Sequence, residues 1–177
     1  MPRSCCSANN LATSKIAAGR VFIGSAGQLL DQALSEAGID RGTVYVTNAV
    51  KHFKWQPRGK RRIHQTPNSR DIAACRPWLE AELRLIKPRV LVCLGSTAAT
   101  TIFGAGARVL RDRGQVRRST FAEKAMITFH PSALLRAPDE ATRAKQYAQF
   151  VSDLRVALEC TKTPAANSHL EHEPAFY

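Results

Sequence analysis

The sequence predicts an α/β domain with a mostly parallel sheet. Segments with helical hydrophobic periodicity alternate with short runs of apolar and β-branched residues, as in strands joined by crossover helices. Such strands pair in parallel through right-handed connections, and a site is expected at their carboxyl ends. With 177 residues the chain is long enough for one domain with a substantial core.

Four segments are expected to be helices. The first spans about 25–38 and ends at a glycine, which suits the left-handed position after a helix. The second spans about 69–87, and Pro77 is expected to bend or restart it. A short helix should lie within 95–104, and Asp139 should cap a long final one.

Three runs are expected to be strands, at 43–50, 89–94 and 125–129. Polar side chains stand where two of them end: Asn48 near the end of the first, and His130 directly after the last. Taken alone, Asn48 is explained as an amide that caps a strand end and His130 as a turn residue before proline. Their common position at the carboxyl edge favours a functional site.

The formal charge of +12, with a pI near 10.1, predicts a polyanionic partner. The cations are scattered through loops and do not line one amphipathic helix, so DNA or RNA is preferred over a lipid surface. No apolar run approaches the ~18 residues of a membrane span. The first twenty residues lack the apolar segment of a secretory signal. A cytoplasmic protein is therefore expected, and no membrane partner.

A cationic loop without carboxylates carries the most specific chemical signal. It contains Lys60, Arg61 and Arg62, followed by His64 and Gln65. The three cations would contact phosphate oxygens, and the imidazole offers a nucleophile at the end of the same loop. The alternative is a solvated basic loop without a function.

Four further segments of the sequence stand out: Phe22–Leu30, Val46–Lys51, Ala74–Leu79 and His130–Arg136. They resemble the signature blocks of the family 4 uracil-DNA glycosylases, in the same order and with the same spacing. The insert Lys60–His64 resembles the loop that marks the X-type branch, whose members bind uracil in DNA and become covalently attached to it. The resemblance covers about Val21 to Glu159 and implies a three-layer α/β/α sandwich with a small central sheet.

The resemblance implies roles for three residues of a uracil pocket. Phe22 is similar to the ring on which the flipped base stacks, although a core aromatic residue is the alternative. Asn48 is similar to the amide that reads uracil, because one side chain offers a donor for O4 and an acceptor for N3–H, a pattern that cytosine does not match. His130 is similar to the histidine beside O2, where a hydrogen bond stabilises the charge on the departing base.

In the X-type branch, the resemblance implies that His64 captures C1′ after uracil has left and forms a covalent adduct. Uracil-containing DNA, with single strands favoured, is then the partner of a monomeric protein. Two alternatives stay open: an ordinary hydrolytic glycosylase that turns over, and a non-catalytic fragment that binds nucleic acid through charge. The implied DNA contacts are Lys60, Arg61, Arg62, Gln65 and Ser132.

The chain departs from the family at its start. The Gly-Glu-x-Pro-Gly block is absent, so residues 1–20 are expected to be disordered or a misassigned start, and the first strand of the sheet to be missing. The glycosylase-like domain is expected at 21–159, followed by a disordered tail at 160–177. This expectation for residues 1–20 follows from their lack of strand periodicity.

The resemblance also implies a four-iron, four-sulfur cluster. Cys75 matches one ligand position, and His52 stands where the family generally has a cysteine. The other two ligands have no counterpart with the right spacing, so His52 and Cys75 are expected to form only a partial site. The alternative for Cys75 is a buried residue on a helix face.

Overall fold

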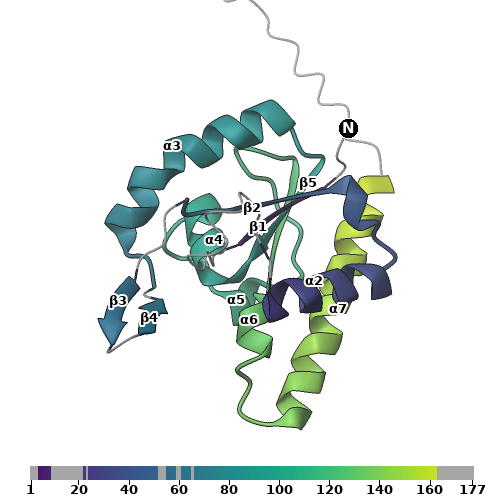
Figure 1. Cartoon of the computed structure of the whole chain (residues 1–177). Helices are drawn as coiled ribbons and strands as arrows, with labels where there is room; N and C mark the ends of the chain where they lie inside the picture. The colour runs from purple at the N-terminus through teal and green to yellow at the C-terminus, as the bar shows by residue number, and fades with distance from the viewer. Residues whose placement is uncertain are drawn as a thin grey trace, which may run out of the picture.

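The centre of the protein is a parallel sheet of four strands in the order β2-β1-β5-β6 (Figure 1). The computed structural model describes residues 4–8, 22, 24–51, 55–58, 61–64 and 66–162. All three strand pairings in this sheet are parallel, which confirms the predicted α/β class. The strands are β1 (Ser4–Ala8), β2 (Val44–Asn48), β5 (Val90–Leu94) and β6 (Lys124–Thr128).

Strand β1 occupies the central position that was expected to be empty. Cys5 pairs with Tyr45 of β2 on one side and with Leu91 of β5 on the other. The prediction of a missing first strand is therefore wrong, and disorder is wrong for Ser4–Ala8. A central strand gains ladder hydrogen bonds from two neighbours, so position in the sheet outweighs the weak strand pattern of Ser-Cys-Cys-Ser-Ala. The rest of 1–20 lies outside the described residues.

One face of the sheet is covered by α2 (Ser25–Glu36), α6 (Pro131–Leu134) and α7 (Glu140–Lys162). Their apolar side chains meet alternate residues of the strands, because successive strand residues point to opposite faces. This cluster includes Leu30, Leu34, Val92, Met126, Phe150 and Leu154.

The opposite face is covered by α3 (Ser69–Ile86) and α4 (Gly95–Phe103), which completes the predicted three-layer sandwich (Figure 1). Two short helices, η1 (Arg41–Thr43) and α5 (Val109–Asp112), lie in connections. The second core cluster includes Leu79, Leu83, Leu91, Cys93, Ala98 and Ile127.

Side chains cap the starts of α3 and α7, and the cap at Asp139 was predicted. Asn68 forms a capping box with Asp71 at the start of α3, and Asp139 accepts the Thr142 N–H at 2.7 Å at the start of α7. Pro77 does not restart α3, because the buried face of the helix continues on both sides of it. Helix α7 extends to Lys162, past the expected start of the tail at 160.

The predicted cationic loop is in part a β-hairpin. Strands β3 (Trp55–Arg58) and β4 (Arg61–His64) pair antiparallel, with Trp55 opposite His64. The hairpin lies between the end of β2 and the start of α3, and Figure 1 shows it beside the N-terminal end of α3. Among the described helices, none is both long and apolar enough to cross a membrane.

Candidate active site

The candidate site lies at the carboxyl edge of the sheet. Because the four strands are parallel, this edge carries Asn48 at the end of β2 and His130 just after β6. The two positions are three strand spacings apart, roughly 14 Å, with the ends of β1 and β5 between them. The two residues therefore stand at opposite ends of the same edge of the sheet.

The Asn48 amide is the most unusual polar group at this edge. Its residue is only 1% exposed, and neither Oδ1 nor Nδ2 has a hydrogen-bond partner among the described residues. Leaving a buried polar group unsatisfied costs about 1–3 kcal/mol, so buried amides are nearly always paired. The amide therefore presents a donor and an acceptor, side by side, to a ligand that enters the site.

The His130 imidazole is held in one orientation and one tautomer. Nδ1 accepts a hydrogen bond from the backbone N–H of Ser132 at 3.0 Å, and the Ser132 hydroxyl lies 2.8 Å from the same nitrogen. A backbone N–H can only donate, so Nδ1 is unprotonated and the neutral ring carries its proton on Nε2. His130 is thus prepared to donate a hydrogen bond through Nε2. Ser132, predicted to contact DNA, also contacts His130 here, and its contact with DNA stays a prediction.

Phe22 lies against His130, with the ring centroids 5.7 Å apart and the ring planes at 27°. The backbone of Phe22 has a φ of 62°, a left-handed value that is uncommon for a residue with a side chain. Its carbonyl packs so closely over Gly27 of α2 that a Cβ there would clash with it. The structure therefore brings Phe22 and His130 together, as a shared site requires.

Gly95 is a residue of the site that sequence reasoning missed. It follows β5 directly and has a φ of 82°. A Cβ at this position would lie 2.8 Å from the Cβ of His130. Glycine therefore permits the close approach between the start of α4 and His130. The available signal was a glycine at the junction of a strand and a helix.

A buried ion pair supports β6 just before His130. Arg113 donates to both carboxylate oxygens of Asp153, at 2.8 and 3.1 Å, and the Thr128 hydroxyl donates to the same carboxylate at 2.5 Å. Burial raises the pKa of Asp153, while the bonds from Thr128 and Arg113 oppose that shift. Arg113 also lies 5.2 Å from the ring centre of Phe129. This cluster holds the two residues that precede His130.

A second cluster ties the end of β2 to α3. The ammonium of Lys51 lies 2.6 Å from Glu82 and 2.7 Å from the Thr47 hydroxyl, which itself donates to Glu82 at 2.8 Å. Thr47 is the residue before Asn48, so this contact anchors the strand end that carries the amide.

The described residues do not fit the iron-sulfur cluster that the resemblance implies. No group of three or more histidine, cysteine, aspartate or glutamate residues gathers as metal ligands in the described part of the chain. Cys75 is 5% exposed, and its sulfur accepts the backbone N–H of Lys51 at 3.2 Å, in agreement with the buried alternative. His52 lies outside the described residues.

The structure describes only some of the residues that were predicted in the cationic loop. His64, Arg61 and Arg62 belong to β4, for which the backbone pairing is described. Lys60 and Gln65 lie outside the described residues. The hairpin enters from the carboxyl end of β2, so its backbone starts from the same edge as Asn48.

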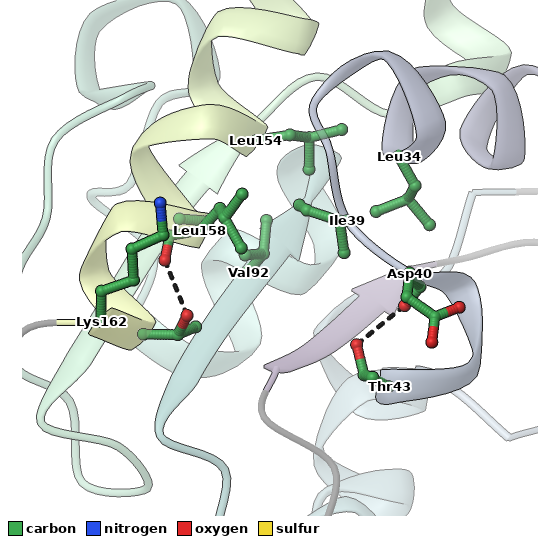
Figure 2. Close-up of a pocket in the computed structure, with 10 residues that line it drawn as sticks. Leu34, Ile39, Asp40, Thr43, Val92, Leu154, Leu158 and Lys162 are labelled. Carbon is green, nitrogen blue, oxygen red and sulfur yellow. Dashed lines mark hydrogen bonds between the residues drawn. The ribbon is translucent and has the colours of Figure 1, made fainter.

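An apolar cavity of about 180 Å³ lies at the opposite edge of the sheet (Figure 2). Lys124 at the start of β6 donates to the carbonyl of Cys160 at 2.8 Å, which places the C-terminal end of α7 at the amino edge. The cavity is thus separate from the candidate site. Its lining includes Leu34, Ile39, Thr43, Val92, Leu154 and Leu158.

Comparison with known proteins identifies the family. Residues 9–155 match the uracil DNA glycosylase superfamily. The type-4 uracil-DNA glycosylase of Pyrobaculum aerophilum is 37% identical over 128 residues, which are 68% of this chain and 62% of that protein. That of Thermotoga maritima is 40% identical over 119 residues, 67% of this chain and 58% of that protein. The chain spans about three fifths of the length of these relatives. By this match and its fold, the chain belongs to the uracil-DNA glycosylase superfamily.

Proposed function

We propose that the protein recognises uracil in DNA, flips it out of the strand and cleaves its N-glycosidic bond. The observation that carries this proposal is the buried Asn48 amide, whose two polar atoms have no partner among the described residues. Taking a base out of the stack costs a few kcal/mol, which contacts inside the pocket must offset. An entering uracil would satisfy both atoms of the amide.

The Asn48 side chain matches the edge of uracil. Its Nδ2 donates to O4 while its Oδ1 accepts N3–H. Cytosine presents the reversed pattern, a donor at N4 and an acceptor at N3, which the amide meets only after rotating by half a turn. Selection against cytosine therefore depends on the orientation of the Asn48 amide.

His130 serves the departing base. When the bond between C1′ and N1 breaks, its electron pair stays with uracil, and negative charge develops on O2. The proton on Nε2, fixed there by the bond from Ser132 to Nδ1, forms a hydrogen bond to that oxygen. Because the donor is already oriented, little reorganisation accompanies bond cleavage.

His64 then captures the cationic sugar. A ring nitrogen of the imidazole donates its electron pair to C1′ and forms a new C–N bond. The other ring nitrogen then loses its proton to water, and the uracil anion that has left takes up a proton. Support comes from the hairpin, which starts from the edge that carries Asn48, and from the position of His64 after three cations. Lys60, Arg61 and Arg62 hold the loop against DNA phosphates, and Gln65 tethers the loop to the DNA. No step passes through a metal cluster.

The test is to incubate the protein with uracil-containing single-stranded DNA and then denature it in hot detergent. A shifted protein-DNA band is expected from the unchanged chain and not from the variant His64→Ala. The variant His172→Ala removes an imidazole from the C-terminal segment and serves as the matched control. Free abasic product without a shifted band would show that water, and not His64, captures the sugar.

The recognition step needs its own comparison. Asn48→Asp keeps the volume of the side chain but removes the donor, so excision of uracil should fall by about 10²-fold, the effect of losing a hydrogen bond at a buried site. An unchanged rate would contradict the role of Asn48. Binding that ignores uracil and weakens steeply with salt would favour a non-catalytic nucleic-acid-binding protein.

A further inference from the structure

A cationic cleft of about 510 Å³ lies at the amino edge of the sheet, away from Asn48 and His130. It is formed where α3 ends, before β5, and by the loop that leads into β6. Three cations contribute to its lining, Arg84, Lys87 and Arg118, against one carboxylate, Glu123. The cleft therefore concentrates positive charge on a surface that the uracil site does not use.

Two of these cations form no polar interaction that would stabilise the described structure. The exposed side chains of Lys87 and Arg118 make no hydrogen bond or ion pair with other described residues. Arg84 is different, because it lies 3.1 Å from Glu80. Like charges that share a cleft repel one another, and a bound anion would relieve that repulsion.

The backbone of Lys87 is strained where it carries its ammonium group. Its φ is 47°, a left-handed value at the C-terminal cap of α3, where glycine is the favoured residue. Strain of this kind is a reason to look for a function of the side chain. The strained residue is one of the two unpaired cations of the cleft.

The remaining lining suits a nucleotide strand. Thr120 adds an exposed hydroxyl, and the half-buried Phe121 is another lining residue. Cations that hold phosphates beside an aromatic surface for bases are the usual features of a single-strand binding groove.

We propose that this cleft binds the phosphodiester backbone of single-stranded DNA, as a second anchor for the strand that holds the uracil. Helix α3 leads from the carboxyl edge, where β2 ends, to the amino edge, where β5 begins (Figure 1). Its 18 residues span roughly 27 Å, the axial length of about eight nucleotides of one strand in duplex-like geometry, at a rise of ~3.4 Å each. Arg70 and Arg76 are also exposed on α3, although Arg76 lies 2.8 Å from Glu80. The inference relies on the proposed function only for the choice of DNA as the polyanion.

The test compares strand lengths. Binding of uracil-free single strands is measured for the double variant Lys87→Ala with Arg118→Ala. A strand of about 30 nucleotides, several times the ~8-phosphate length of α3, should bind about tenfold more weakly, and the salt dependence should lose ~1.4 units of log-log slope. A strand shorter than this length, and uracil excision from it, should be unchanged. Equal losses for both strands, or none, would overturn the proposal.

Two further variants make the test specific. Arg155→Ala with Lys162→Ala removes the same charge from α7, on the other face of the sheet, and should leave long-strand binding within twofold. A loss equal to that of the cleft variant would refute a local site. Lys87→Gly relieves the left-handed strain, so it should raise Tm by about 2–4 °C while it weakens binding of the long strand. Unweakened binding in this stable variant would also refute the inference.

Two separate measurements distinguish the cleft from the uracil site. Uracil-free strands report on the cleft whether or not the protein excises uracil. Excision from a short strand reports on Asn48 and His130 whether or not the cleft binds DNA.

Discussion

Removal of the Asp153 carboxylate should destabilise the end of β6 on which His130 depends. Asp153 is 4% exposed, and its carboxylate accepts hydrogen bonds from the Arg113 guanidinium and from the hydroxyl of the fully buried Thr128. In Asp153→Ala, the guanidinium of Arg113 is left without its partner, and Thr128 loses its acceptor. Breaking a buried ion pair from one side costs about 3–5 kcal/mol.

The lower end of that range is the expected value. The Arg113 side chain is 20% exposed, so solvent partly compensates the cation, and a loss of about 3 kcal/mol in the free energy of unfolding follows. This is a large share of the roughly 5–15 kcal/mol that stabilises a typical domain. Thr128→Val, which removes only the hydroxyl, should cost about 1 kcal/mol.

Urea unfolding at neutral pH measures these losses. The double variant Arg113→Ala with Asp153→Ala should be more stable than the sum of the single losses predicts, by about 1–3 kcal/mol, because it leaves no unpaired charge. Strict additivity, or a loss below about 1 kcal/mol for Asp153→Ala, would refute this account of the cluster.

The contribution of the Asp153 carboxyl to stability depends on pH in a defined direction. Burial raises the pKa of Asp153 above its unfolded value of about 3.9, so the folded protein binds more protons between the two values. The contribution of this carboxyl is complete below the unfolded pKa and declines as the pH rises through the folded pKa. The stability of the wild type relative to Asp153→Asn should therefore be greatest in acid, and the opposite trend would contradict the raised pKa.

Four further substitutions test the site and its supports. Gly95→Ala should lower both Tm and the excision rate, because its φ is 82° and the new Cβ would lie 2.8 Å from that of His130; an unaffected variant would contradict the close approach. In single-turnover excision, Ser132→Ala should lose about tenfold because its backbone N–H remains, whereas His130→Ala should lose about 10²–10³-fold; equal losses would count against the assigned tautomer. Bonds from the Thr142 backbone and hydroxyl lower the pKa of Asp139, so that stabilisation is present above about pH 4 and lost as the pH falls through the folded pKa. The Tm difference between wild type and Asp139→Asn should narrow in acid, and a constant difference would exclude this cause.

Strand β1 takes a central place in the sheet without a strong strand pattern of its own. Ser4–Ala8 lie between β2 and β5 and pair with both. A strand bounded on both sides contributes mainly backbone hydrogen bonds to the ladder, which every residue except proline can form. The sheet order is thus compatible with a segment that shows little strand character of its own.

Helices and most strands could be predicted because their signals are local. The apolar spacing in α3, the capping residue Asn68 and the β-branched run of β2 each act within a few residues. The positions of Asn48 and His130 at strand ends were also visible, because parallel strands place their carboxyl ends at one edge. The carboxyl edge could therefore be proposed as the site before any contact was known.

The sequence by itself determined the α/β class, the order of its helices and three of the four strands of its central sheet, and the two polar residues at the carboxyl edge. Only the tertiary structure decided that Ser4–Ala8 form the central strand and that Arg113 reaches Asp153, forty residues further along the chain. It also decided the tautomer of His130 and the closeness of Gly95. These features depend on contacts between segments that are distant in sequence, and local propensity carries no information about such contacts.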